Sequence, residues 1–198
     1  MRFRRFWLFA ALMSVSTVAF AQSDAPRSST LPTAPKTVAQ PDAQKSFDVL
    51  KTMAGSWEGE LTTFPPEPTA NHKLSRLSLR VTSMGNSLVH EMEVDGRPDH
   101  PVTMFYVDND RLLLTHYCDA GNRPRMVGKV SPDGKTVEFT FLDLSGGNEY
   151  GHMQHALFTS VDANHHIEEW TYMEPGDKPV RAHFDLHRTS ETGVVSGK

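Results

Sequence analysis

His90, His116 and His155 each stand in a segment where apolar and polar residues alternate. Because successive side chains of a strand point to opposite faces, each histidine is expected to share a face with the apolar residues two positions away. Three inward imidazoles would suit a transition metal, and one could be an axial haem ligand. The favoured alternative is that each is a polar residue hydrogen-bonded inside the fold. No His-Glu-x-x-His spacing occurs, so no cofactor is assigned.

Cys118, the only cysteine, follows His116 by two residues, so both side chains are expected on the same face of a strand. A thiolate there could act as a nucleophile activated by His116. An enzyme could also use His116 as general base, with Tyr117 or Cys118 assisting. A small buried thiol that packs as an apolar residue is the favoured alternative. The chain has no Gly-x-Ser-x-Gly, phosphate-binding loop or dinucleotide fingerprint. An enzyme acting on a small molecule is therefore the less favoured prediction, and no catalytic residue is assigned.

Arg125 follows the loop after His116 and is expected at the mouth of a cavity. A guanidinium there could form two hydrogen bonds with a carboxylate of a ligand. Methionine side chains adapt to irregular apolar guests. The pair His165-His166 lies at a predicted turn, where surface exposure is expected. The predicted ligand site consists of His90, Met92, Met104, Leu114, His116, Tyr117, Arg125, Phe139 and His155.

The first 21 residues have the pattern of an export signal, with three arginines, an apolar stretch and a small-residue cleavage site between Ala21 and Gln22. The apolar stretch, Phe6 to Phe20, is shorter than the roughly 20 residues needed to span a bilayer. We therefore expect a periplasmic or secreted protein without stable membrane insertion after cleavage. Beyond residue 21 the chain has 17 basic and 24 acidic residues, a net charge of −7 that fits nucleic acid poorly.

Composition divides the remaining chain into three parts. Residues 22–45 are rich in Pro, Ser and Ala and predict a disordered linker. Residues 46–190 are richer in aromatic, β-branched and Met residues and predict one folded domain. Residues 191–198 predict a disordered tail.

The domain begins with a short predicted helix, for which Ser46 is the expected N-cap and Gly55 the end. Turn residues then separate segments with a period of two. The predicted strands are Trp57–Thr62, Leu77–Val81, Leu88–Val94, Val102–Val107, Leu112–Tyr117, Met126–Val130, Thr136–Leu142, Met153–Val161, His166–Met173 and Val180–Arg188. Closing such a meander removes its exposed edges. The prediction is an all-β, antiparallel up-and-down barrel of about ten strands with a short N-terminal helix.

Gly55-Ser56-Trp57 stands at the start of the first predicted strand, and Arg188 lies near the end of the last. A tryptophan there can close one end of a barrel, and the arginine can lie over it. With these residues the chain resembles the calycin superfamily, the lipocalins and related barrels, over roughly residues 47–189. Residues 113–118 and 121–126 are also similar to uncharacterised exported bacterial lipocalin-like proteins. The resemblance implies the binding of a small molecule of unassigned identity. We expect this molecule to be largely apolar or amphipathic and to carry a polar or anionic group. Unlike many lipocalins, a chain with one cysteine has no internal disulfide.

Overall fold

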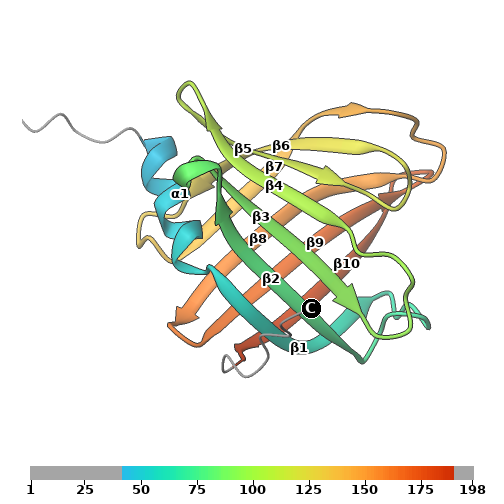
Figure 1. The fold of residues 1–198 in the computed structure, drawn as a ribbon. Coiled ribbons are helices and arrows are strands. Elements are labelled where there is room, and N and C mark those ends of the chain that lie inside the picture. The colour runs from blue at the N-terminus through green and yellow to red at the C-terminus, as the bar shows by residue number, and fades with distance from the viewer. Residues whose placement is uncertain (1–41, 190–198) are drawn as a thin grey trace, which may run out of the picture. The chain divides into compact units, whose positions relative to one another are not determined.

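Ten antiparallel strands form one closed barrel in the computed structural model, which describes residues 42–189 (Figure 1). Each strand pairs with its neighbours in sequence, and β10 pairs with β1 to close the ring. The predicted all-β up-and-down barrel is therefore confirmed. The predicted export signal, the predicted tail from residue 191 and nearly all of the predicted linker lie outside the described residues. The strands are β1 (Gly55–Phe64), β2 (Lys73–Thr82), β3 (Ser87–Val94), β4 (Val102–Asp108), β5 (Arg111–Tyr117), β6 (Arg123–Val130), β7 (Thr136–Ser145), β8 (His152–Asp162), β9 (His165–Glu174) and β10 (Lys178–Arg188).

The helix α1 (Asp42–Thr52) begins four residues before Ser46, so the expected N-cap is wrong. Ser46 lies in the second turn, where its hydroxyl donates to the Asp42 carbonyl at 2.8 Å and accepts from the Val130 amide at 3.1 Å. The side chain therefore ties α1 to β6. Residues 42–45, assigned to the linker from composition, form the start of this helix. Phe47 and Leu50 bury its apolar face.

Trp57 and Arg188 connect the first and last strands at the end of the barrel that α1 adjoins. The Trp57 indole donates to the Met53 carbonyl at 2.9 Å, and the Arg188 guanidinium lies 4.1 Å from the indole centroid. Arg188 also donates to the Ala54 carbonyl at 2.8 Å and the Ala163 carbonyl at 3.0 Å. At Gly55, where φ is +146°, a Cβ atom would lie 2.0 Å from the Arg188 Nη1. Only glycine therefore leaves room for the guanidinium.

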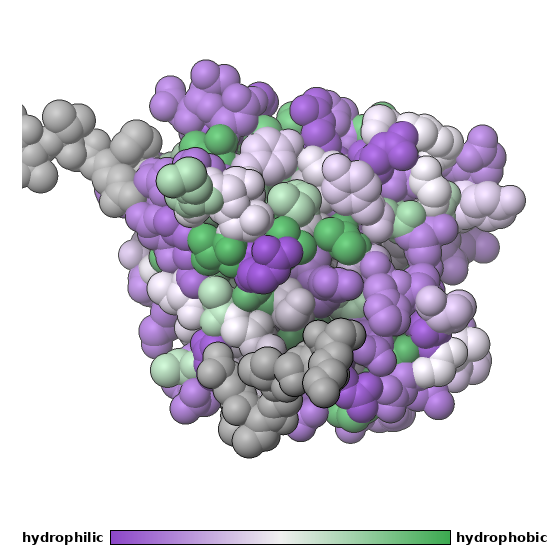
Figure 2. All heavy atoms as spheres, viewed as in Figure 1, coloured by the Kyte–Doolittle hydropathy of each residue, from purple (hydrophilic) through white to green (hydrophobic). Residues whose placement is uncertain are grey.

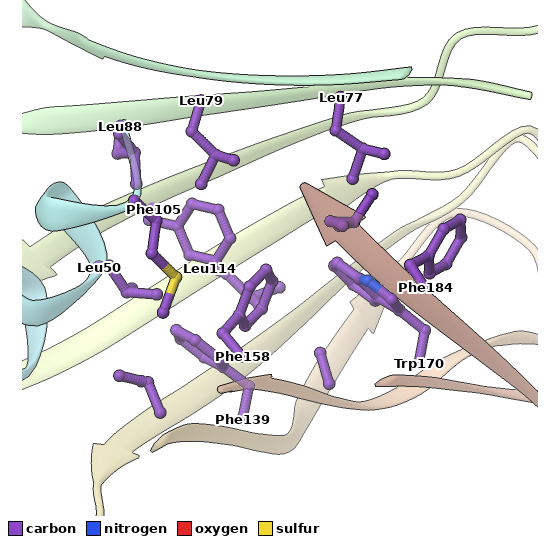
Figure 3. Close-up of a cluster of buried hydrophobic side chains, with 14 of the residues drawn as sticks. Leu50, Leu77, Leu79, Leu88, Phe105, Leu114, Phe139, Phe158, Trp170 and Phe184 are labelled. Carbon is purple, nitrogen blue, oxygen red and sulfur yellow. The ribbon is translucent and has the colours of Figure 1, made fainter. Parts of the chain in front are cut away.

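The half of the barrel next to α1 is filled with packed side chains (Figure 3). Phe105, Phe139 and Phe158 form an aromatic triangle with ring centroids 5.3–5.9 Å apart. Leu50 of α1 and Leu114 of β5 pack against the same cluster, and all five side chains are fully buried. Two of the three ring pairs are edge-on and the third is tilted, and such aromatic packing stabilises a core beyond the area it buries. Large side chains from the helix and from several strands therefore pack together in this half of the interior.

The outer surface carries both hydrophilic and apolar residues. Hydrophilic residues cover most of the face in Figure 2, with some apolar residues among them. The 3-10 helix η1 (Ser83–Gly85) joins β2 to β3 and carries the exposed Met84. Among residues 42–189, no helix has both the length and the apolar character needed to cross a lipid bilayer.

Candidate functional site

The half of the barrel away from α1 contains a cavity of about 430 Å³. It opens where the β1–β2, β3–β4, β5–β6 and β9–β10 loops meet, at the opposite ends of the strands from Trp57 and Arg188. Its walls are largely apolar, because inward residues of four strands and one loop face it. These wall residues are Leu61, Pro101, Met92, Val94, Met153, Val180, Ala182 and Phe184. The side chains at the two ends of the strands thus give the barrel one packed end and one hollow end.

His116 and Trp170 bring polar atoms to the inner part of this cavity. The His116 Nδ1 lies 2.8 Å from the Thr103 hydroxyl, its register partner on β4. The imidazole is 5 % exposed, and its centroid is 5.4 Å from the Trp170 ring. Burial, with a smaller contribution from the charge of His90, lowers the pKa of His116 to about 3. At neutral pH the cavity therefore contains an uncharged imidazole, oriented by Thr103, with Nε2 left for a ligand.

A buried polar cluster lies between the cavity and the packed core. The Glu168 carboxylate accepts from the Trp170 indole at 3.0 Å and lies 3.1 Å from His166 Nε2 and 3.2 Å from His90 Nε2. Burial alone would raise the pKa of Glu168, but the charge of His90 and the hydrogen bond from His166 lower it well below its usual range. Trp170 thus connects a buried carboxylate to the cavity wall.

This cluster was not predicted from the sequence, and the expectation that His166 is exposed at a surface turn is wrong. His166 is 1 % exposed and packs edge-on against Trp57, with ring centroids 4.1 Å apart. The spacing of these residues could have predicted the cluster, because residues two apart in a strand share a face. His166, Glu168 and Trp170 accordingly lie on one face of β9. Large aromatic residues such as Trp170 are commonly buried, which places the two polar residues inside as well.

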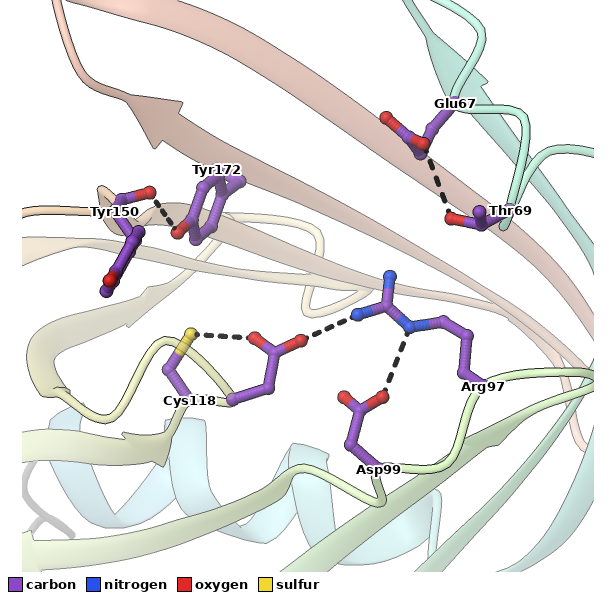
Figure 4. Close-up of polar contacts among 8 residues, drawn as sticks. Glu67, Thr69, Arg97, Asp99, Cys118, Tyr150 and Tyr172 are labelled. Atoms are coloured by element: carbon purple, nitrogen blue, oxygen red, sulfur yellow. Dashed lines mark hydrogen bonds and ion pairs between the residues drawn. The ribbon is translucent and has the colours of Figure 1, made fainter.

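The mouth of the cavity carries an arginine held between two carboxylates (Figure 4). Arg97 donates to Asp99 at 3.3 Å and to Asp119 at 2.6 Å. Partial burial opposes ionisation of Asp99, but the hydrogen bond and charge of Arg97 lower its pKa below the usual value. Glu67 and Glu174 also line the cavity. The cavity lining therefore contains four carboxylates and one guanidinium, so the mouth has a net negative charge.

Cys118 and Tyr172 line the same mouth, and both remain protonated at neutral pH. Burial and the nearby Asp119 raise the pKa of the Cys118 thiol to about 11. Burial, with the charges of Cys118 and Asp119, raises the pKa of Tyr172 to about 12. The Tyr172 hydroxyl donates to the Tyr150 carbonyl at 2.6 Å. A thiol with this pKa is a poor nucleophile, because the thiolate is the reactive form.

Two of the nine residues predicted for the ligand site, Met92 and His116, line the cavity. His90 is buried beside Glu168, below the cavity wall. Leu114 and Phe139 belong to the packed core. Met104 and Tyr117 directly follow the inward Thr103 and His116 in their strands. Their side chains therefore point to the outside of the barrel. This position of Tyr117 separates it from the cavity in which it was expected to assist His116.

Arg125 lies on the outer face of β6, so the expectation that it stands at the cavity mouth is wrong. Its neighbours in the strand, Pro124 and Met126, are buried, and the intervening side chain points outward. The guanidinium forms a two-point ion pair with Asp143 of β7, with one N–O distance of 2.8 Å. That hydrogen bond and charge raise the pKa of Arg125. The arginine at the mouth is Arg97, from the β3–β4 loop.

His155 also lies outside the barrel, so the expectation that it points inward is wrong. The pairing of β8 with β9 shifts register between Met153 and His155, which is the irregularity of a β-bulge. The shift allows Met153 to line the cavity while His155 contacts Glu138 on the outer surface at 2.9 Å. The expected trio of inward histidines, His90, His116 and His155, therefore does not meet inside the barrel.

Comparison with known proteins supports the barrel fold and leaves the function open. No protein-family model matches the chain, and a search of curated proteins finds no match. A solved protein of unknown function from the DUF3598 family of Nostoc punctiforme matches with a TM-score of 0.51 and 9 % identity, over 71 % of this chain and 49 % of that one. This chain thus spans about half the length of that relative.

A second solved structure, Rv2717c from M. tuberculosis, matches with a TM-score of 0.55 and 17 % identity. The match covers 73 % of this chain and 98 % of that one. At these identities the likeness concerns the fold alone. The described chain is a closed ten-stranded antiparallel barrel, and both solved structures resemble it in fold.

Proposed function

We propose that this protein is an exported barrel that binds a small, largely apolar molecule in its hollow end. The observation that carries the proposal is the contrast between the two halves of the interior. Aromatic and aliphatic side chains fill the half next to α1, whereas the other half leaves about 430 Å³ between apolar walls. Unfilled space forfeits dispersion contacts, so a barrel selected only for stability would be packed throughout. The volume lies within the range of small-molecule sites.

His116 provides the polar recognition deep in this site. Its pKa of about 3 keeps the ring neutral, and the contact with the Thr103 hydroxyl holds the ring in place. The Nε2 atom can then form one hydrogen bond with a ligand, as donor or acceptor according to the tautomer. A single hydrogen-bonding atom among apolar walls suits a guest with one small polar group on a hydrocarbon body.

The charge at the mouth decides which polar groups the site accepts there. Glu67, Asp99, Asp119 and Glu174 outnumber Arg97, and Arg97 already donates to two of them. A carboxylate in the mouth would meet net repulsion, whereas an amine or a neutral hydroxyl would not. We therefore propose a neutral or cationic amphipathic ligand. This replaces the anionic group that was inferred from Arg125.

The test measures ligand binding to protein purified from the periplasmic fraction, where cleavage at the predicted site makes Gln22 the first residue. Octylamine, octanol and octanoate share one hydrocarbon chain and differ in the charge of the head group. We expect octylamine and octanol to change the fluorescence of Trp170, which lines the cavity, and octanoate to bind at least about tenfold more weakly. Tighter binding of octanoate would contradict the assignment of the head group.

Ala182→Leu tests whether binding occurs in the cavity, because the larger side chain would occupy the space next to Trp170. We expect it to weaken octylamine binding at least about tenfold, a change of about 1.4 kcal/mol. Ala163→Leu is the matched control, since Ala163 lies in the exposed turn between β8 and β9. Equal affinity of both variants would place the ligand elsewhere. A Soret band in the purified protein would instead favour a haem protein with His116 as axial ligand.

A further inference from the structure

A second cluster of chemically reactive side chains lies on the outside of the barrel, away from the cavity. His165 stands at the start of β9, and His187 and Asp185 stand near the end of β10. These positions lie at the packed end of the barrel, near Trp57 and Arg188. The cavity opens at the other ends of the same strands. The cluster is therefore independent of the proposed ligand site.

Antiparallel pairing places the three side chains on one surface. His187 and His165 are direct register partners, and Asp185 precedes His187 by two residues on the same face of β10. The two imidazoles are stacked, with centroids 4.5 Å apart and planes inclined by 23°. The Asp185 Oδ1 lies 2.8 Å from His165 Nε2 and 3.4 Å from His187 Nε2. Two imidazole nitrogens and one carboxylate oxygen thus converge, with ligand atoms within 4.8 Å of one another.

We propose that His165, Asp185 and His187 bind a divalent transition-metal ion such as Zn²⁺. Imidazole nitrogen and carboxylate oxygen are ordinary zinc ligands, bound at about 2.0–2.2 Å. Tetrahedral coordination at those lengths separates ligand atoms by about 3.3 Å, which is close to the distances found here. Three protein ligands leave a coordination position for water or another ligand. The exposed Asp185 and His187 give an ion direct access from solvent.

One further carboxylate lies on the outer surface beside the cluster. Glu58 is the register partner of His187 on β1, and its side chain is exposed on the same outer surface. An isolated surface ion pair stabilises a fold by at most about 1 kcal/mol. Such a pair would need only one imidazole beside one carboxylate. Here two stacked imidazoles both lie beside one carboxylate oxygen, so three potential ligand atoms surround one point on the surface. Neighbouring strands of a closed barrel hold the ligands in place, so little ordering accompanies binding.

The experiment is a calorimetric titration of the untagged chain with ZnCl₂, since a polyhistidine tag would bind the metal itself. We expect one high-affinity site per chain, and His187→Ala should weaken it at least about tenfold. His183→Ala is the matched control: His183 lies on the same outer face of β10, contacts Glu169 at 3.7 Å and is outside the cluster. It should change the affinity less than about twofold.

Two results would overturn the proposal: wild-type protein that binds no Zn²⁺ at 100-fold molar excess, or equal losses for His187→Ala and His183→Ala. Thermal melting provides a second measurement, because an ion that binds only the folded chain raises the Tm. Saturating Zn²⁺ should raise the Tm of the wild type and of His183→Ala, and leave that of His187→Ala nearly unchanged. Identical Tm shifts in all three proteins would assign binding to other residues.

Discussion

Replacing Glu168 by alanine should greatly destabilise the fold, although the residue lies outside both proposed binding sites. The carboxylate is completely buried and lies within 3.0–3.2 Å of the Trp170 indole nitrogen and of His166 and His90. Its removal leaves these groups buried without their anionic partner. Each orphaned buried donor costs about 1–3 kcal/mol, and breaking a buried ion pair about 3–5 kcal/mol. Because these costs overlap, we expect the free energy of unfolding to fall by about 3–5 kcal/mol.

Urea denaturation followed by circular dichroism measures this change without depending on the fluorescence of Trp170. For a domain of this size the loss corresponds to a decrease in Tm of about 6–20 °C. Glu168→Gln keeps an acceptor for the indole and should lose less than Glu168→Ala. Glu169→Ala is the matched control, since Glu169 is the exposed neighbour on β9 and should change stability by less than about 0.5 kcal/mol. A Glu168→Ala protein within 1 kcal/mol of the control would refute the reasoning.

The pH dependence provides an independent check on Glu168. Its pKa in the folded state lies below the ordinary value of 4.5, so the folded protein holds this proton less tightly than the unfolded chain. The resulting stabilisation is complete above pH 4.5 and is lost as pH falls toward the folded pKa. The gap in stability between the wild type and Glu168→Gln should therefore be widest near neutral pH and narrower at pH 3. A gap that is constant over this range would show that ionisation of Glu168 contributes nothing.

Two further predictions concern His116 and Gly55. His116 has a folded pKa of about 3 against 6.5 for the free side chain, so below pH 6.5 the unfolded chain takes up a proton that the folded protein excludes. Between pH 8 and pH 5 the wild type should lose about 2 kcal/mol more than His116→Gln in urea denaturation, and parallel profiles would contradict the buried neutral imidazole. Gly55→Ala should lower stability by about 1–3 kcal/mol, because φ is +146° and the new Cβ would displace Arg188; an unchanged Tm would count against this closure of the barrel.

Strand positions and most strand faces could be predicted from the sequence. Apolar residues at every second position reveal which side chains a strand buries, and turn residues between such segments indicate antiparallel neighbours. The same local rule places His116 inside the barrel and Tyr117 outside it. The alternation of faces along β6 and β9 would also have placed Arg125 outside the barrel and the Glu168 cluster inside it.

The tertiary structure decided the features that depend on two or more strands. The bulge in β8 turns His155 outward while Met153 stays inside, and it is a property of pairing with β9 rather than of β8 alone. Ser46 contacts β6 from inside the helix, a contact between segments that are 84 residues apart in the sequence. The division into a packed and a hollow end follows from how side chains of all ten strands fill a shared interior. The sequence by itself therefore determined the barrel, because strand period and turns are local. The tertiary structure decided the cavity, which needs distant strands to surround one interior, and the cluster of His165, Asp185 and His187, which needs the register of β9 against β10.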